Sequence, residues 1–224
     1  MKKYELTTET LQFAGRTLHR IKAVKDFGSV YAGQFGGWIE NEKNLSQDDN
    51  AWIYGDAMVF GNANVFGNAK VFANAKVYDD AIVYANAKVY GDAKILGNAI
   101  VYGNAIVHGN AKIYDYAKVY DKANIYDFAE VYGNVRICGN ATIKGVAKVH
   151  DIVDYIVFKN FWSSGRYFTW TRSNNKWSVG CFYGTGEELI KKAYADSEKS
   201  GREYERVVRY VESILADEKK EKSN

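Results

Sequence analysis

Small and aliphatic residues recur every six positions through the middle of the chain, from Ala51 to Ile152. This segment is made of 17 consecutive hexapeptides, which begin AWIYGD, AMVFGN, ANVFGN. The first position is Ala in 16 of them, with Val135 as the exception, and the third position is Val or Ile in all 17. A repeat of this regularity predicts a stack of identical structural units.

The six-residue period excludes long helices and coiled coils, whose apolar positions recur every 3.6 or 3.5 residues. The Ala-x-Val alternation puts both apolar side chains on one face of a short strand. The residues that follow, most often Tyr-Gly-Asn, favour a turn, because Gly and Asn adopt positive φ at low cost. One strand and one corner per hexapeptide predict a parallel β-helix. With three hexapeptides in a triangular coil, the 17 repeats give between five and six coils.

Residues 1–50 lack the hexapeptide and predict an N-terminal β cap. Polar and apolar side chains alternate over Leu18–Val24, and a Gly-rich stretch follows. The hexapeptide frame cannot be extended backwards, because Gln47 then takes an inward position, so we expect the repeat to begin at Ala51. The first coil of a solenoid has an unpaired edge, which a preceding β segment would cover.

Residues 153–224 predict a small α+β module with a three-stranded sheet and two helices. The second and third strands flank Asn174-Asn175, a two-residue hairpin turn that pairs Trp170 with Val179. Thr185-Gly186-Glu187-Glu188 is a capping box that opens the first helix. A second amphipathic helix is expected after Gly201. The fold class is therefore an all-β solenoid with an N-terminal cap (1–50), a repeat region (51–152) and this module.

The 30 basic and 27 acidic residues give a net charge of +3 and are spread evenly along the chain. An even distribution does not favour nucleic acid as a partner. The chain contains two cysteines and no long apolar run. These features predict a soluble, cytoplasmic protein that has no disulfide framework and does not interact with a membrane.

The repeat resembles that of the hexapeptide-repeat proteins, whose fold is a left-handed triangular β-helix and whose characterised members are mostly trimeric acyl- or acetyltransferases. Those repeats usually place a small or acidic residue after the buried aliphatic, whereas that position is aromatic in 12 of the 17 repeats here. The variant A-x-V-Y-G-N, the stretch Gly36-Gly37-Trp38-Ile39-Glu40 and the run W-S-V-G-C-F-Y-G-T from Trp177 look like a set of uncharacterised bacterial and prophage β-helix proteins. This resemblance implies a left-handed solenoid but assigns no activity.

The outward second positions of the repeats predict two candidate surfaces on the solenoid. Taking every third hexapeptide gives one face a column of lysines, which are anion-binding candidates: Lys76, Lys94 and Lys112. A column of outward lysines also discourages sideways aggregation, and we favour that simpler interpretation. Three outward isoleucines are candidates for an oligomer interface: Ile82, Ile100 and Ile106. The family resemblance implies a trimer, and a dimer through the C-terminal module is the alternative.

Few residues in the chain are suited to catalysis. His108 and His150 occupy corner positions on different faces, and His19 lies in the cap. A zinc site of the kind found in β-helical carbonic anhydrases needs three converging histidines, which this spacing does not provide. Cys138 takes a corner position normally held by Tyr, so it is not expected to act as a nucleophile. We therefore expect no catalytic residue, no metal site and no cofactor.

The non-repetitive C-terminal module carries the candidate partner-binding residues, because Trp and Arg dominate binding hot spots. The candidates are Arg166, Arg172, Trp170 and Trp177. Some of the aromatic residues must form the core of the module, so the two arginines are favoured over Trp170. Thr185 and Gly186, before the first helix, are further anion-binding candidates, although the capping box already gives them a structural role.

Two functions remain after these exclusions. The first, which we favour, is a non-catalytic scaffold that binds a protein or small molecule. The resemblance to prophage proteins implies a host partner, for example a component of a defence system. The second is an acyltransferase-like enzyme with its site between subunits. An enzyme of that family should bind acyl-CoA, and a scaffold should not.

Overall fold

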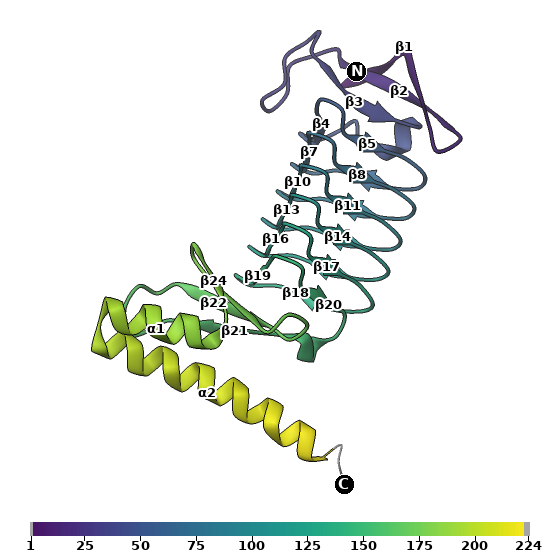
Figure 1. Ribbon diagram of the computed structural model, residues 1–224. Coiled ribbons are helices and arrows are strands. Elements are labelled where there is room, and N and C mark those ends of the chain that lie inside the picture. The colour runs from purple at the N-terminus through teal and green to yellow at the C-terminus, as the bar shows by residue number, and fades with distance from the viewer. Residues whose placement is uncertain (1, 222–224) are drawn as a thin grey trace. The chain divides into compact units, whose positions relative to one another are not determined.

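The computed structural model describes residues 2–221, and the chain divides into two compact units. The first ends at Asp154 and contains a β-solenoid with a β cap at its N-terminal end; the second begins at Tyr155 and contains a sheet and two helices (Figure 1). The predicted fold class, an all-β solenoid with a small α+β module, is confirmed.

Each hexapeptide contributes one two-residue strand, formed by its second and third positions. The strands are β4 (Trp52–Ile53), β5 (Met58–Val59), β6 (Asn64–Val65), β7 (Lys70–Val71), β8 (Lys76–Val77), β9 (Ile82–Val83), β10 (Lys88–Val89), β11 (Lys94–Ile95), β12 (Ile100–Val101), β13 (Ile106–Val107), β14 (Lys112–Ile113), β15 (Lys118–Val119), β16 (Asn124–Ile125), β17 (Glu130–Val131), β18 (Arg136–Ile137), β19 (Thr142–Ile143) and β20 (Lys148–Val149).

These strands pair in parallel with the strands one coil away and form three sheets. The orders are β5-β8-β11-β14-β17-β20, β4-β7-β10-β13-β16-β19 and β6-β9-β12-β15-β18. Val101, for example, is aligned with Val83 on one side and Val119 on the other. Three sheets with one strand per coil give the predicted triangular section and about six coils.

The interior of the solenoid consists of the first and third residues of the hexapeptides. All of them are buried, including the exceptional Val135. Each buried Val or Ile contributes about 1.5–3 kcal/mol of transfer free energy relative to exposure. The alternation of small Ala with branched Val or Ile therefore supplies a continuous core.

The fifth residue of the hexapeptide turns each corner, with positive φ from Gly55 through Gly145. Gly fills this position in most repeats because the left-handed region strains other residues. Asp takes it in several repeats and adds a hydrogen bond between coils: the Asp127 carboxylate accepts the Gly145 N–H at 3.0 Å. Asp79, Asp115 and Asp121 accept the equivalent N–H groups of Gly97, Gly133 and Gly139.

The N-terminal cap contains β1 (Tyr4–Phe13) and β2 (Arg16–Ala23), which are antiparallel, followed by β3 (Phe35–Ile39). Strand β3 pairs in parallel with β5, so that Trp38 lies opposite Met58. The expectation that the repeat begins at Ala51 was therefore incomplete, because parallel pairing already starts in β3. The spacing in that first coil is two residues longer than in the others, and this hides the register in the sequence.

Side chains of the cap satisfy backbone groups that the first coil leaves unpaired. The Asn44 amide donates to the carbonyls of Gly61 and Ala63 at 3.0 and 2.8 Å. The buried Lys3 ammonium donates to the carbonyls of Asp49 and Ala51 at 3.0 and 2.9 Å. Burial lowers the pKa of Lys3, because the charged form loses solvation.

The second unit has a four-stranded antiparallel sheet and two helices. Its elements are β21 (Tyr155–Lys159), β22 (Tyr167–Thr171), β23 (Lys176–Val179), β24 (Phe182–Gly184), α1 (Gly186–Asp196) and α2 (Glu198–Glu221). The sequence predicted three strands and did not identify β24. Helix α2 begins before Gly201 rather than after it. Within the helix Gly201 packs against Tyr194, whose ring would lie 2.2 Å from an added Cβ.

The β22–β23 hairpin differs from the prediction by a shift of two residues. Trp170 lies opposite Trp177, not Val179, because residues 172–175 form a longer loop in which Asn175 has positive φ. The Trp170 indole N–H donates to the Asn175 side chain at 2.9 Å and holds that loop. A shift by two residues leaves the same side chains on the apolar face.

Neither α1 nor α2, the two α-helices among residues 2–221, is long and apolar enough to cross a membrane.

Candidate binding surfaces

The aromatic fourth residues of the hexapeptides stack in columns along the corners of the solenoid. Phe66, Tyr84, Tyr102 and Tyr120 form one column, with ring centroids 4.9 to 5.0 Å apart and planes within 8° of parallel. A ring covered on both faces by its neighbours offers only its edge to a ligand. Within a column these rings therefore cannot stack on a base or a sugar.

His108 is a member of such a column and replaces the usual Tyr. Its ring lies between Tyr90 and Tyr126, with both centroid distances 4.7 Å. Burial lowers the pKa of His108, which favours the neutral ring. The environment of His108 is that of a stacked structural residue.

His150 forms a close pair with a buried carboxylate at the end of the solenoid. Its Nδ1 lies 2.6 Å from Oδ2 of Asp154, and 58% of the His150 side chain is exposed. The same Asp154 oxygen accepts the backbone N–H groups of His150 and Asp151 at 2.9 and 3.0 Å. A shallow depression of about 290 Å³ lies beside the pair. It is lined by Asn134, Val135, Arg136, His150, Asp151 and Ile152.

A similar turn at the other end of the solenoid explains this pair. There the Asn44 side-chain oxygen accepts the N–H groups of Glu40 and Asn41 at 3.1 and 2.9 Å. Asn44 is the last residue of a 3-10 turn (Glu42–Asn44). Asp154 is likewise the last residue of a 3-10 turn (Ile152–Asp154). The two ends of the repeat are thus closed by the same device, and Asp154 has a structural reason to lie beside His150.

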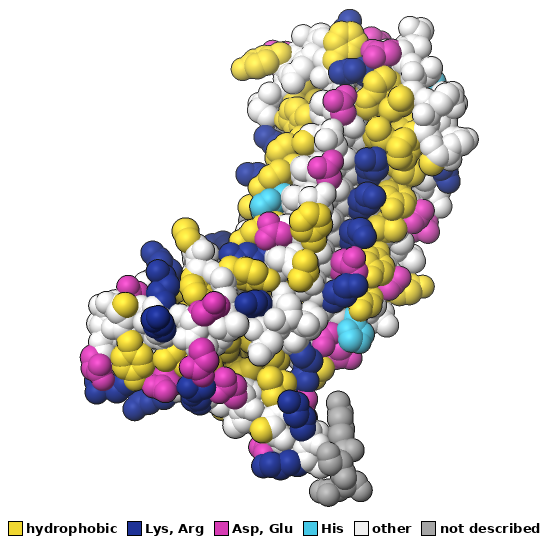
Figure 2. All heavy atoms as spheres, viewed as in Figure 1, with side chains coloured by type: hydrophobic (Ala, Val, Ile, Leu, Met, Phe, Trp, Pro, Cys, Tyr) yellow, Lys and Arg dark blue, Asp and Glu magenta, His cyan; other side chains and the backbone are white. Residues whose placement is uncertain are grey.

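The lysine column lies along the sheet that contains β8, β11 and β14. Lys94 is directly paired with Lys76 on one side and Lys112 on the other. Figure 2 shows basic side chains stacked in a column along one face of the solenoid. Glu130 interrupts the column and lies 3.4 Å from Lys112 and 3.6 Å from Lys148. The column is therefore partly neutralised towards its C-terminal end.

The Tyr114 hydroxyl lies 3.5 Å from the Glu130 carboxylate. Burial, followed by the negative charge of Glu130, raises the pKa of Tyr114 to about 12. Because the Glu130 carboxylate lies beside Lys112 and Lys148, an anion on this face would lie nearer Lys76 and Lys94.

The three outward isoleucines lie on two different sheets. Ile82 and Ile100 are adjacent in register on β9 and β12, whereas Ile106 lies between Lys88 and Asn124 on β13. All three are half-buried. The first two form a continuous apolar spot, and their role in assembly stays a prediction.

The turn before α1 is occupied by the side chains of the helix itself. Glu188 accepts the Thr185 N–H at 2.7 Å, and the Thr185 hydroxyl accepts the Glu188 N–H at 3.2 Å. The hydrogen bond from the Thr185 backbone lowers the pKa of Glu188. Because a carboxylate already occupies this helix end, Thr185 and Gly186 are poor candidates for binding an anion.

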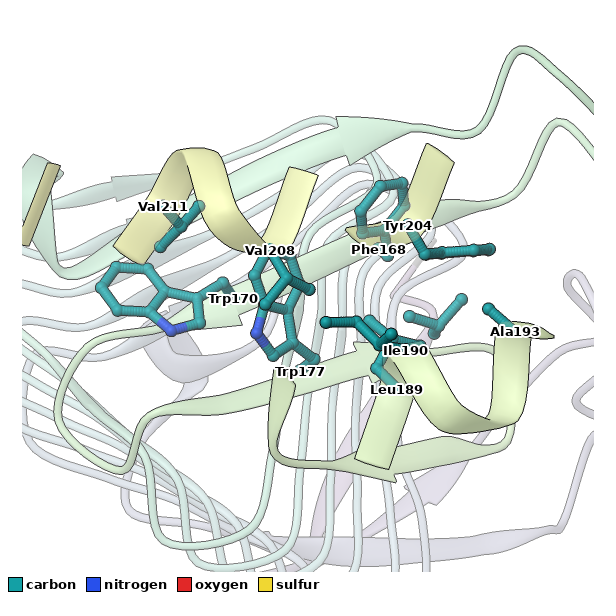
Figure 3. Packing of buried hydrophobic residues seen from close by; sticks show 10 residues of the cluster. Phe168, Trp170, Trp177, Leu189, Ile190, Ala193, Tyr204, Val208 and Val211 are labelled. Atoms are coloured by element: carbon teal, nitrogen blue, oxygen red, sulfur yellow. The ribbon is translucent and has the colours of Figure 1, made fainter. Parts of the chain in front are cut away.

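Trp170 and Trp177 belong to the core of the second unit and do not present a binding surface. They are 1% and 2% exposed and pack with Phe168 and residues of both helices (Figure 3). The cluster consists of Phe168, Trp170, Trp177, Val179, Leu189, Ile190, Ala193, Tyr204, Val208 and Val211.

The two candidate arginines differ in their surroundings. Arg172 forms two hydrogen bonds to the Glu218 carboxylate, at 2.6 and 2.9 Å, and so ties the hairpin loop to α2. Arg166 is exposed, and its guanidinium packs beside Gly180. Of the four predicted partner-binding residues, Arg166 is the one that the structure leaves on the surface with its charge accessible.

The side chains that could support other chemistry do not converge. In the part of the chain that the structure describes, no three His, Cys, Asp or Glu side chains lie close enough to hold a metal ion. The predicted pairing of Trp170 with Val179 would place Cys181 opposite Phe168 on the apolar face of the hairpin. Cys181 is instead exposed, in the turn between β23 and β24. Cys138 is half-buried.

Sequence reasoning missed the most exposed aromatic residue of the second unit. Phe161, in the loop between β21 and β22, has 84% of its surface exposed. A loop residue has no periodic pattern that would reveal its exposure. The sequence did indicate the basic character of the segment around this loop, because residues 155–186 contain four basic residues and no acidic ones.

The fold and the repeat define this protein as a β-solenoid that fits the hexapeptide-repeat type. A family described as the YdcK beta solenoid repeat matches residues 93–109, about one coil. Over 62 residues the chain is 40% identical to a protein of Escherichia coli K12 described as the uncharacterized acetyltransferase YdcK. This match covers 24% of the chain and spans 19% of that relative's length.

Proposed function

We propose that this protein is a non-catalytic binding scaffold, in which the solenoid is a rigid support and the second unit recognises a protein partner. The proposal is carried by the surroundings of the two histidines in the repeat. His108 is enclosed between Tyr90 and Tyr126, and His150 belongs to the turn that ends the solenoid. Neither environment requires a catalytic explanation.

The regularity of the solenoid also supports a scaffold. Chemistry normally takes place in a pocket where a few polar groups converge, and a surface that repeats every coil offers columns instead. The second unit is not repetitive and can encode a specific surface. We further propose that the partner is a host protein, in line with the resemblance to prophage β-helix proteins, and that the chain acts as a homo-oligomer.

The test is purification of the tagged full chain from its native host under gentle conditions. A scaffold should retain a partner in a fixed molar ratio after size-exclusion chromatography. Acetyl-CoA added to the protein should not bind to it, and no free CoA thiol should be released. Saturable binding of acetyl-CoA together with thiol release would contradict the proposal.

The second candidate function is acetyl transfer, which the name of the Escherichia coli relative favours. If the chain had this activity, His150 would be the residue to examine, because its exposed ring and its contact with Asp154 suit a general base. His150→Ala should then abolish thiol release, while His108→Ala should not. If neither variant changes the background rate, the chain has no acetyl-transfer activity that uses these histidines.

A further inference from the structure

The sheet of the second unit and its connecting loops are basic. Between residues 155 and 186 the charged residues are Lys159, Arg166, Arg172 and Lys176, and the first acidic residue after Tyr155 is Glu187. Arg172 is engaged by Glu218 from α2. Lys159 and Arg166 are both exposed. Residues 155–186 therefore carry only positive charge, which favours a negatively charged ligand, and the acidic residues of the unit lie in α1 and α2.

The loop between β21 and β22 has a defined shape despite its exposure. The Asn160 N–H donates to the Arg166 carbonyl at 2.7 Å and closes the loop. The Asn160 side chain is 1% exposed; its oxygen accepts the N–H groups of Trp162 and Ser163, and its amide donates to the Tyr204 hydroxyl at 3.1 Å. An asparagine anchored in this way fixes the loop on the core.

This loop presents an aromatic side chain outwards. Trp162 points back to the core and meets the rings of Phe168 and Tyr204 edge-on, at 6.1 and 5.3 Å. Phe161 rests against Trp162, at 5.2 Å between centroids, and remains 84% exposed. Exposing a large apolar side chain on an ordered loop gains nothing for folding. Single exposed apolar side chains are common on protein surfaces. Phe161 is distinguished by the two exposed cations, Lys159 and Arg166, that flank it on either side of the loop.

We propose that the β21–β22 loop is a docking site for an acidic segment of a partner protein, with Phe161 as the apolar anchor and Lys159 and Arg166 as the charged contacts. This inference rests on the proposed binding function and identifies the surface and the chemistry of the partner. Pre-organisation of the loop by Asn160 lowers the entropy that binding must overcome. The flanking cations favour an acidic sequence and disfavour a basic one.

An acidic protein segment fits this surface better than a nucleic acid. Single strands bind on exposed ring faces within an extended basic groove. Here Phe168 and Trp170 are buried, and the Lys159 ammonium lies 5.9 Å from the centre of the exposed Tyr167 ring. One exposed anchor flanked by two cations suits a short motif with one apolar residue among carboxylates.

The test is a random-peptide display selection on the immobilised full-length protein, followed by binding measurements on the selected consensus peptide by fluorescence anisotropy. Four proteins are compared: the wild type, Phe161→Asp, the double variant Lys159→Glu/Arg166→Glu, and Tyr31→Asp. Tyr31 is the matched control, because it is an aromatic residue of the cap with 71% exposure. Circular dichroism and thermal melts confirm that each variant is folded.

We expect acidic consensus peptides that contain an aromatic or aliphatic residue. Phe161→Asp and the double variant should each weaken their binding by at least about tenfold, the usual effect of removing a hot-spot residue, and Tyr31→Asp should change it less than about twofold. Failure to select a peptide, or selection of neutral or basic peptides, would overturn the inference.

Two further outcomes separate this inference from the function on which it rests. Peptides that bind the wild type and Phe161→Asp equally would overturn the docking site and leave the scaffold function intact. Turnover of acetyl-CoA by the wild type would remove the scaffold function itself. Binding of a single-stranded oligonucleotide or of anionic vesicles that depends on Phe161, in place of peptide binding, would reassign the loop to that class of partner.

Discussion

Within the solenoid, an inward Val or Ile lies in register with the same type of residue in the coils above and below. Val101 is fully buried between Val83 and Val119. A carboxylate at this position would be buried without a partner, so Val101→Asp should lower the free energy of unfolding by at least about 3 kcal/mol, or prevent folding. Lys94→Asp, on an outward position, should change it by less than about 1 kcal/mol. Equal melting temperatures for the two variants would contradict the inward and outward assignment.

His108 gives the solenoid a pH dependence whose sign follows from burial. Because the pKa of His108 is lowered, the His108 ring binds a proton less readily in the folded chain than in the unfolded chain, where the pKa of a histidine is about 6.5. The corresponding stability is present above about pH 6.5 and is lost as the pH falls through the folded pKa. His108→Tyr restores the usual corner residue and should reduce that loss.

Urea denaturation of both proteins at about pH 7.5 and about pH 5.5 measures this effect. The decrease in free energy of unfolding between the two pH values should be larger for the wild type than for His108→Tyr. A larger decrease in the variant would contradict the assigned environment of His108.

At the residue scale, periodicity predicted which side chains are inward, since one short strand recurs with one register. It could not predict which aromatics of the second unit are buried. Trp170 and Trp177 are covered because α1 and α2 pack on their face of the sheet, and which face the helices choose is a tertiary property. Phe161 is exposed because Asn160 fixes the loop, a contact between residues far apart in sequence.

At the scale of the element, the corners decide how closely successive coils approach. Gly103 and Gly139 have nearly the same φ, +69° and +66°. A Cβ on Gly103 would lie 2.8 Å from the Asp121 backbone nitrogen, whereas a Cβ on Gly139 would meet nothing within 4 Å. A comparison of alanine substitutions at the two positions therefore distinguishes the cost of backbone strain from the cost of steric contact between coils.

Gly139→Ala should cost about 1 kcal/mol, the usual penalty for a side chain in the left-handed region. Gly103→Ala should cost roughly 1–3 kcal/mol more, because the coil must also shift. Chemical denaturation of the two single variants provides the measurement. A smaller loss for Gly103→Ala than for Gly139→Ala would show that the coils do not approach as described.

Elements were predictable where the pattern was local and regular. The strands of the repeat and the capping box at Thr185 and Glu188 follow from short-range rules. The first coil was not predictable, because its two additional residues break the period, and its strand β3 is recognised only by its pairing with β5. The hairpin register was also missed, since two Asn residues suit either a two-residue turn or the longer loop that Trp170 stabilises.

At the scale of the whole molecule, the outward Ile82 and Ile100 predict self-association. Two adjacent apolar side chains on a flat sheet gain free energy when a second copy covers them. We expect the wild type to elute as a homo-oligomer at micromolar concentration, and the folded double variant Ile82→Asp/Ile100→Asp to elute as a monomer. Size-exclusion chromatography with light scattering measures both. A monomeric wild type would remove the prediction, and an oligomeric variant would place the interface elsewhere.

The measurement that tests the account most directly is the dissociation constant of the partner recovered from the native host, determined for two folded full-length variants. Lys94→Glu/Lys112→Glu reverses the charge of the solenoid face, and Phe161→Asp/Arg166→Glu alters the loop of the second unit. If the solenoid is a support and the second unit recognises the partner, the solenoid variant should bind like the wild type, and the loop variant should bind at least about tenfold more weakly. The reverse order would place recognition on the solenoid and contradict the account.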